Sequence, residues 1–439
     1  MAGRRSFLGA LGATSLATLV PAESARASSA SAAAPVKTSA RIVIAGGGAA
    51  GLTAANKLAT QLSGATIVMI DRRKEHYYQP GFTLVAAGIK PQDYTVSQTA
   101  SYVPRGVEWV NEAVVEIDPV GNKVVTDSGK SQSYDFLIVA TGLELNYGAI
   151  EGMDTARIGQ DGLGSIYNGP QAAADTWKAM SAFADQGGIG LFGRPAGEMK
   201  CAGAPLKYSF ITDDHLRRRG NRGKAELIYM AHVKALFGVP IVSEKVRMLF
   251  QDRDIKVRQE HVLQAIDLGR KVATYKTTNG LVEQNYDFIN VVPPMRAPEV
   301  VRNSPLPWTE GIWAADGWME VDRNTLRHKR FPNVFGVGDV AGVPKGKTAA
   351  SVKWQVPVAT SHLIGDITGK ASTESYNGYT SCPLITRLGR AMLVEFDYQD
   401  NLVPSFPGVI APLEELWVTW VMKTMGLKPT YLTMIRGRA

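Results

Sequence analysis

Thiols are scarce in this sequence: Cys201 and Cys382 are the only cysteines among 439 residues. That number excludes a small scaffold held together by disulfides. Long apolar runs are also missing, since no stretch reaches the roughly 18 uninterrupted apolar residues of a membrane-spanning helix. Charge of one sign does not dominate either: 48 Lys and Arg face 40 Asp and Glu, and the longest basic cluster is residues 217–219. Nucleic-acid binding is therefore disfavoured, although a mild basic excess suits an anionic membrane surface.

What remains is the composition of an ordinary globular protein. Apolar residues make up 45% and charged residues 20% of the chain, and 44 glycines allow many tight turns. These values exclude collagen-like and disordered chains. The length allows two or three domains and a core that can bury a large cofactor.

The first residues have the pattern of an export signal. Arg4 and Arg5 precede an apolar stretch, and residues 25–27 (ARA) match a cleavage site between small residues. We therefore predict a twin-arginine signal over residues 1–27 and a linker over residues 28–40; the alternative is a disordered tail that happens to contain two arginines. Export by this route predicts a periplasmic protein, in a compartment where two cysteines can persist as a disulfide.

A glycine fingerprint follows the first strand-like segment. Residues 41–45 (RIVIA) run into Gly46, Gly48 and Gly51 in the spacing G-x-G-x-x-G, followed by a helical stretch and a strand that ends at Asp71. The first glycine allows the turn, the second lets the backbone approach a pyrophosphate, and the third allows close helix packing. The helix N-terminus attracts the negative charge, and the aspartate can accept hydrogen bonds from a ribose. The segment predicts a dinucleotide site.

Two later strands end in short glycine motifs, Ala-Thr-Gly within residues 134–142 and Gly-Asp within residues 331–339. With the fingerprint, they resemble the disulfide-reductase-like flavoproteins from about residue 40 to 375. The resemblance implies an α/β fold of two Rossmann-like dinucleotide-binding domains and a bound FAD, with Asp339 on a ribityl hydroxyl. No cysteine lies within residues 71–90, so the FAD is expected to be non-covalent. The expected cofactor-binding residues are Gly46, Gly48, Gly51, Asp71, Val114, Thr141, Gly142, Gly338, Asp339, Lys347 and Thr348.

The second domain lacks a glycine fingerprint of its own. Residues 187–195 read GGIGLFGRP, in which Gly190 and Gly193 have the wrong spacing and Pro195 interrupts the first helical turn. We predict that this domain shares the ancestry but has lost a nicotinamide site, so the electron donor is not NAD(P)H. The predicted boundaries are residues 41–150 and 285–375 for the FAD domain, 151–284 for the second domain and 376–439 for a C-terminal region.

The two cysteines lie in distinctive segments, KCAGAPLK (200–207) and YNGYTSCPLIT (376–386). From the residues alone they are either a redox-active pair beside the flavin or a structural disulfide. Closing a loop of about 180 residues is worth about 4–5 kcal/mol in the chain-entropy model. A domain of this size has little need of a disulfide for stability. In addition, Lys200 and Lys207 can favour the reactive thiolate, so both arguments favour the redox-active pair.

These segments, together with VVPPM (291–295), GKTAASV (346–352) and LVEFDY (393–398), resemble the mitochondrial-type branch of the sulfide:quinone oxidoreductases. The resemblance implies that Cys201 and Cys382 form an oxidised pair, bridged directly or through extra sulfur. Sulfide attacks Cys382 and leaves a persulfide there, while Cys201 passes two electrons to FAD, which reduces a quinone. The sulfur then leaves to sulfite, a thiol or a polysulfide.

Two lysines are candidates for supporting roles. Lys347, with Thr348, opens the helix after the Gly-Asp motif, where a cation can stabilise reduced flavin; the alternative is an exposed lysine of the first turn. Lys207 either orients substrate or acceptor, or is simply a solvated helix lysine.

The C-terminal segment 404–439 carries apolar residues near helical spacing, interspersed with cations. We predict that Gly426 and Pro429 break it into two short amphipathic helices that lie in a membrane interface. The alternative is a helix that covers the flavin domain or a homo-oligomer interface. Phe396 and Tyr398 are expected to help line a quinone slot. The apolar positions are Leu413, Leu416, Trp417, Trp420, Val421 and Met425, and the cations are Lys423, Lys428, Arg436 and Arg438.

Three other functions are weighed. The flavin subunit of a flavocytochrome sulfide dehydrogenase also has two distant cysteines, but it carries a further cysteine for covalent FAD in the segment matching residues 76–80, where this sequence has none. An NAD(P)H dehydrogenase is disfavoured by the missing second fingerprint. A flavin-binding interaction protein with a structural disulfide is the non-catalytic alternative.

Overall fold

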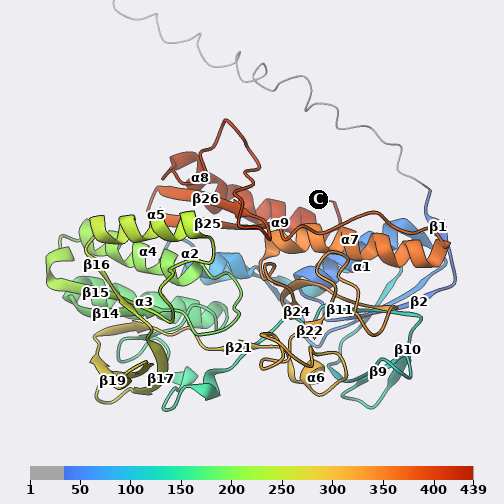
Figure 1. Cartoon of the computed structure of the whole chain (residues 1–439), viewed down its shortest axis with the longest axis horizontal. Helices are drawn as coiled ribbons and strands as arrows, with labels where there is room; N and C mark the ends of the chain where they lie inside the picture. Colours follow the sequence, from blue (N-terminus) through green and yellow to red (C-terminus); the bar gives the residue numbers. More distant parts are fainter. Residues whose placement is uncertain (1–33, 439) are drawn as a thin grey trace, which may run out of the picture. The chain divides into compact units, whose positions relative to one another are not determined.

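A computed structural model describes residues 34–438 of the chain (Figure 1). The predicted export signal and residues 28–33 of the predicted linker therefore lie outside the described residues. The described end of that linker already belongs to the fold, because β1 (Val36–Lys37) pairs in parallel with β3 (Leu62–Ser63).

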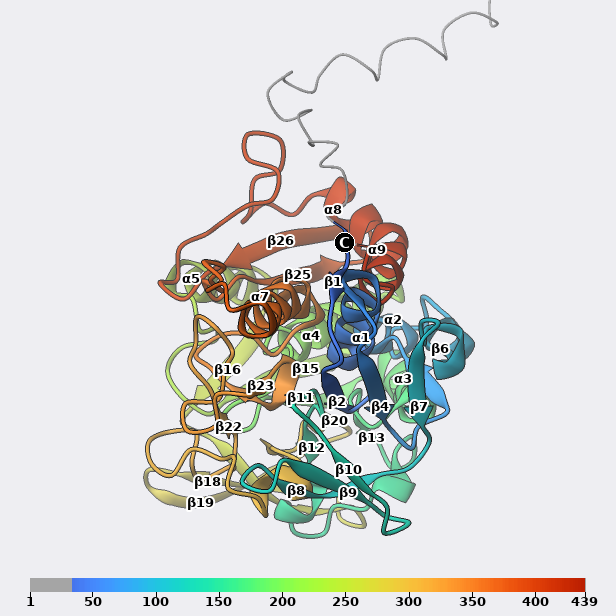
Figure 2. The ribbon, with the colours of Figure 1, turned by 90° about the vertical axis from the view of Figure 1, so that its right-hand side faces the viewer.

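The first Rossmann-like domain is built on a five-stranded parallel sheet of order β23-β11-β2-β4-β7. Its strands are short and rich in Val and Ile, and most of their side chains are buried, as expected for a parallel sheet covered on its faces. Helices α1 (Ala49–Gln61) and α7 (Ala349–Thr368) lie side by side against it (Figures 1 and 2). The strands are β2 (Arg41–Ala45), β4 (Thr66–Ile70), β7 (Val107–Val110), β11 (Phe136–Val139) and β23 (Val334–Gly336).

The second domain repeats this plan with a parallel sheet of order β13-β20-β14-β15-β16. Its strands are β13 (Leu163–Gly164), β14 (Gly188–Gly193), β15 (Ala225–Ala231), β16 (Ile255–Gln259) and β20 (Phe288–Asn290). Its helices are α3 (Pro170–Gln186), α4 (Ala204–Arg218) and α5 (Pro240–Asp252). The expected boundary at residue 284 is too early, because β20 pairs with β13 and β14 and so belongs to this sheet.

Each domain also carries a small antiparallel sheet. One is formed by β8 (Val114–Asp118), β9 (Lys123–Thr126) and β10 (Ser131–Ser133). The other is formed by β17 (Val262–Asp267), β18 (Val272–Thr277) and β19 (Gly280–Asn285).

The C-terminal region is a hairpin followed by a helical tail. Strands β25 (Thr380–Arg387) and β26 (Arg390–Phe396) pair antiparallel, and β25 packs against both α4 and α7. The tail, drawn in red in Figure 1, comprises α8 (Trp417–Val421), a π-helical turn (Met422–Gly426) and α9 (Leu427–Ile435), which packs on α1. Within the described part of the chain, none of the helices has the length and apolar character needed to cross a membrane.

The predicted breaks in the tail are wrong. Helical structure runs through Gly426 and Pro429, because the π turn closes on Met422 through the Leu427 amide, and the proline falls in the first turn of α9. There its missing N–H costs little. The Thr430 hydroxyl donates to the Gly426 carbonyl at 3.0 Å and supplies a side-chain bond across this junction.

Candidate functional site

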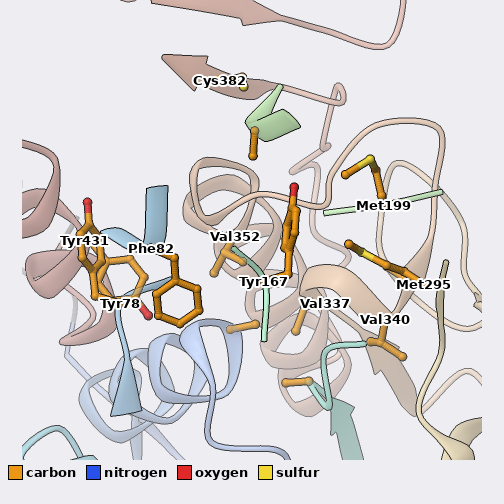
Figure 3. Packing of buried hydrophobic residues seen from close by; sticks show 14 of the residues in the cluster. Tyr78, Phe82, Tyr167, Met199, Met295, Val337, Val340, Val352, Cys382 and Tyr431 are labelled. Carbon is orange, nitrogen blue, oxygen red and sulfur yellow. The ribbon is translucent and has the colours of Figure 1, made fainter. Parts of the chain in front are cut away.

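One large cavity, of about 560 Å³, brings together the predicted cofactor motifs, both cysteines and the C-terminal tail. Its walls include the fingerprint loop, the Ala-Thr-Gly and Gly-Asp motifs and the first turn of α7. Figure 3 shows Cys382 above this space, with Tyr78, Phe82 and Tyr431 on one side and Tyr167 on the other. Of the predicted residues, Gly48, Thr141, Gly142, Gly338, Asp339, Lys347, Thr348, Cys201 and Cys382 line it.

The fingerprint glycines are required by close backbone packing. Gly46 has φ of +106°, and a Cβ there would lie 2.5 Å from the Ala140 carbonyl oxygen. A Cβ on Gly51 would lie 1.8 Å from the carbonyl oxygen of Gly46, so α1 can sit against the turn only with glycine at this position. At Gly48 the nearest atom would be 3.6 Å away, on the Arg73 side chain. The geometry therefore agrees with the separate roles predicted for the three glycines, namely the turn, the approach to a pyrophosphate and the close helix packing.

Asp71 is held by the protein itself. Its Oδ2 accepts a hydrogen bond from the Gly47 amide at 2.6 Å and forms an ion pair with Arg73 Nη2 at 3.1 Å. Burial alone would raise the pKa of this carboxyl, but the Arg73 guanidinium and the amide bonds hold the pKa below its usual value. Arg73 lines the cavity and Asp71 does not, so a ribose contact of Asp71 stays a prediction.

The two thiols meet although they lie in different parts of the fold. Cys201, in the β14–α4 loop, and Cys382, on β25, have their sulfurs 4.0 Å apart. The Cys201 amide donates to the Lys347 carbonyl at 3.0 Å, and its own carbonyl accepts from the Tyr167 hydroxyl at 3.1 Å. Cys201 has φ of +48°, an unusual value for a residue with a side chain. The loop is thus held in one conformation that presents the sulfur to its partner.

Lys207 controls the charge of this pair. Its Nζ lies 3.3 Å from the Cys201 sulfur and 3.7 Å from the Cys382 sulfur, and the side chain is 2% exposed. A hydrogen bond from Cys382 and the positive charge of Lys207 hold the pKa of Cys201 well below its usual value, despite burial. The same sulfur–sulfur bond and burial raise the pKa of Cys382. These effects favour the thiolate on Cys201 in the reduced pair, and the solvated-lysine alternative for Lys207 is wrong because the side chain is buried.

A second buried lysine approaches from the tail. Lys423, in the π-helical turn, is 3% exposed, lines the cavity and donates to the Pro80 carbonyl at 2.9 Å. Burial, together with the charge of Lys207, lowers the pKa of Lys423 to about 7. The prediction that Lys423 is one of the cations of a membrane-interface helix is therefore wrong, because its side chain is buried.

Lys347 is buried as well, and its ammonium is bound inside the protein. Nζ donates to the carbonyls of Asp339 and Ala341 at 2.7 and 2.9 Å and lies 3.6 Å from the centre of the Trp318 ring. Burial lowers the pKa of Lys347 to about 8. The alternative of an exposed lysine is therefore wrong. Thr348, the next residue, caps α7 by accepting from the Ser351 amide.

Known proteins are similar to this chain in sequence and in fold. A family model for pyridine nucleotide-disulphide oxidoreductases matches residues 40–174. The mouse protein named sulfide:quinone oxidoreductase, mitochondrial, is 34% identical over 369 residues, covering 83% of this chain and 80% of the mouse protein. A Dictyostelium discoideum protein of the same name is 34% identical, over 85% of this chain and 81% of its own length. The chain belongs to the sulfide:quinone oxidoreductase family.

A solved structure supports the fold of this family member. The X-ray structure of the sulfide:quinone oxidoreductase from Aquifex aeolicus superposes with a TM-score of 0.74 at 23% identity and covers 91% of this chain and 92% of that one. The predicted α/β disulfide-reductase-like flavoprotein fold is therefore confirmed.

FAD is the cofactor of this sulfide:quinone oxidoreductase family member, and the cavity fits it. The Thr141 hydroxyl is buried without a hydrogen-bond partner in the described residues, and Gly142 has φ of +73° with open space at its Cβ position. The Asp339 carboxyl lines the same space, and burial raises its pKa. The structure does not support Val114 as a contact for FAD, because this residue begins β8, pairs with Thr126 and does not line the cavity.

The two residues predicted to line a quinone slot do not line the cavity. Phe396 packs on Phe237 and Tyr398 packs on Tyr376, and neither lines the cavity. The lining comes instead from Trp354 on α7, Tyr379 and Glu395 of the hairpin region, and Ser405 and Phe406 of the following loop. These residues are not predictable from the sequence, since LVEFDY shows which residues alternate along β26 but not which face of the strand meets the cavity.

The tail closes one wall of the same cavity. The Tyr431 hydroxyl lies 2.7 Å from His76 Nε2, and both residues line the space. Lys428 donates to the Tyr94 carbonyl at 2.6 Å, and the Arg436 guanidinium lies 4.7 Å from the centre of the Tyr102 ring. The alternative of a helix that covers the flavin domain is therefore correct for α9.

Proposed function

We propose that this chain is a sulfide:quinone oxidoreductase that works through Cys201 and Cys382. The observation that carries the proposal is the thiol pair, 4.0 Å apart beside Lys207, in the wall of the cavity that also holds the FAD motifs. A structural disulfide needs neither the buried lysine nor the shared cavity. The membership of the family and the names of its relatives support the same substrates.

The residues divide the sulfur chemistry between them. Hydrosulfide attacks the Cys382 sulfur of the oxidised pair, which forms a persulfide on Cys382 and releases Cys201 as a thiolate. Lys207 stabilises that thiolate, because its ammonium is within 3.3 Å of the sulfur. When the Cys201 thiolate and the Cys382 persulfide rejoin as a sulfur-bridged pair, two electrons are released, and bound FAD would supply the carrier that passes them to a quinone. The extra sulfur then leaves to an external nucleophile, namely sulfite, a thiol or a polysulfide, which restores the oxidised pair.

The exposed apolar residues of the C-terminal region suit a membrane surface. Trp354 and Phe406, which line the cavity, are 50% and 43% exposed. Trp417, Val418 and Met425 of the tail are 61%, 44% and 68% exposed. The cations Lys423, Lys428 and Arg436 contact the protein instead, so the proposed membrane contact is mainly apolar. A quinone would enter the cavity from the lipid on this side.

We also propose that residues 1–27 direct export by the twin-arginine route, which places the enzyme on the periplasmic side of the membrane. The paired Arg4 and Arg5 and the ARA sequence at residues 25–27 support it. Cell fractionation of the full chain and of a variant with Arg4→Lys and Arg5→Lys tests this: loss of the periplasmic fraction in the variant is expected, and identical fractions would overturn it.

Anaerobic titration of the purified yellow protein tests the reaction. One equivalent of sulfide is expected to bleach the flavin absorbance, and a short-tail quinone is expected to restore it. Bleaching by NADH but not by sulfide would overturn the proposal. Bleaching by sulfide with recovery only on addition of a cytochrome would favour the flavocytochrome alternative.

Liposome flotation tests the membrane contact separately. Trp417→Ser combined with Met425→Ser is expected to reduce binding of the full chain to vesicles of anionic phospholipid. Ile312→Ser is the matched control, since Ile312 is 77% exposed and lies outside the C-terminal region. Equal binding of all three proteins would show that the tail is not a membrane contact.

A further inference from the structure

A buried carboxylate lines the cavity where the β25–β26 hairpin meets it. Glu395, on β26, is 3% exposed and lines the cavity. Its strand is otherwise apolar where it is buried (AMLV before it and Phe396 after it), so an apolar residue would have suited the packing. A carboxylate at such a position costs several kcal/mol unless it is hydrogen-bonded. Its presence calls for an explanation beyond folding.

The bonds of Glu395 connect the cavity to the solvent. Its Oε1 accepts from the Tyr379 hydroxyl and, at 2.6 Å, from the Ser405 hydroxyl; Oε2 accepts from the Ser405 amide at 2.7 Å. Tyr379 is half-buried, lines the cavity and lies with its ring 5.5 Å from that of Trp354. Ser405, in contrast, is exposed. The three residues form a continuous chain of hydrogen-bonding groups with one end in each environment.

Quinone reduction needs such a connection. A quinone that takes up two electrons must also take up two protons to leave as a quinol, so a group that can donate a proton must lie beside it. Burial and the bond to Glu395 raise the pKa of the Tyr379 hydroxyl, so this group keeps its proton until an acceptor and a new donor are both in place.

We propose that Tyr379 and Glu395 deliver the protons for quinone reduction; the inference rests on the proposed function. Tyr379 gives its hydroxyl proton to a quinone oxygen, and Glu395 passes it a replacement proton taken up from solvent beside Ser405. Two such proton transfers supply the two protons. The two electrons come from sulfide through FAD, so quinone becomes quinol with no further reactant. Tyr379 touches the substrate, and Glu395 and Ser405 act through it.

Stopped-flow measurement of the two half-reactions on the holoenzyme tests the proposal. In Glu395→Gln and in Tyr379→Phe, bleaching of the flavin by sulfide is expected at the wild-type rate. Reoxidation by a short-tail quinone is expected to slow by about 10²-fold, the usual loss when a proton donor is removed. Glu395→Asp should recover part of the rate. Glu310→Gln, at an exposed position, is the matched control and should change neither half-reaction.

A second electron acceptor separates proton delivery from structural damage. Ferricenium accepts electrons without protons, so it should reoxidise both variants at the wild-type rate. In deuterated water, reoxidation by quinone should show a larger isotope effect in Glu395→Gln than in the wild type. If Glu395→Gln does not fold, Ser405→Ala provides the same comparison with a smaller expected slowing.

The outcomes distinguish this inference from the proposed function. A wild-type enzyme that does not reduce quinone after bleaching by sulfide refutes the function. A wild-type enzyme that does, with variants that are unaffected or equally slow with ferricenium and quinone, refutes the proton relay alone.

Discussion

Gly203 lies so close to the thiol pair that there is no room for a side chain at this position. Gly203 caps α4 with φ of −82°, so alanine is allowed by its backbone. A Cβ there would lie 2.4 Å from the Cys382 sulfur and 3.2 Å from Leu384 Cδ1. Carbon and sulfur need about 3.5 Å or more, so Gly203→Ala must move β25 away from α4 by roughly 1 Å.

The cost of this movement can be estimated for stability and for catalysis. Adding a methyl group to a packed core typically costs about 1–3 kcal/mol of unfolding free energy. A shift of about 1 Å between reacting groups typically costs about 10²-fold in rate. Gly203→Ala is therefore expected to lower the midpoint of denaturant unfolding and to slow bleaching of the flavin by sulfide, while FAD stays bound.

Gly223→Ala is the matched control for this experiment. Gly223 also has no positive φ, and nothing lies within 4 Å of its Cβ position. Its unfolding midpoint and its bleaching rate should equal those of the wild type. If Gly203→Ala behaved in the same way, the close approach of α4 to Cys382 would not constrain the pair, and the reasoning would be refuted.

Three further predictions concern the same site. Cys201→Ser and Cys382→Ser should each abolish bleaching by sulfide with FAD retained, and the double variant should be hardly worse because the thiols act as a unit; turnover in either single variant would contradict this. Acid precipitation should release all the flavin into the supernatant, whereas yellow colour in the pellet would mean a covalent bond. In Lys207→Met the pKa of Cys201 should rise, so bleaching should be slow at neutral pH and recover as the pH increases; a rate profile identical to the wild type would exclude the proposed charge effect.

Some features of the site follow directly from sequence because they depend on local backbone geometry. The spacing of Gly46, Gly48 and Gly51 reports a turn and a helix contact that only glycine allows, and such requirements appear in the sequence as fixed residues at fixed distances. The first Rossmann-like domain is predictable for the same reason, whereas the second is predicted only by the resemblance to the disulfide-reductase-like flavoproteins. The position of β20 is not predictable, because a three-residue strand has no periodicity that would assign it to one sheet or the other.

Other features depend on contacts between distant segments. Cys201 and Cys382 are 181 positions apart in the sequence, which allows many distances between them, and the observed 4.0 Å results from the packing of β25 on α4. The cations of the tail also illustrate this limit. Lys423 has the same appearance in sequence as a membrane-facing lysine, but the Pro80 carbonyl gives it a buried partner.

The packing of α9 on α1 also affects the order in which the protein folds during synthesis. Asn56 on α1 donates to the Ile435 carbonyl at 2.9 Å, and His76 meets Tyr431, so α9 completes a wall begun more than 350 residues earlier. During translation the flavin cavity therefore stays open on this side until α9 has left the ribosome. A nascent chain arrested before residue 427 would expose the apolar face of α1 and Tyr78 to chaperones. Stable capture of the cofactor therefore requires that α9 has been synthesised and has packed on α1.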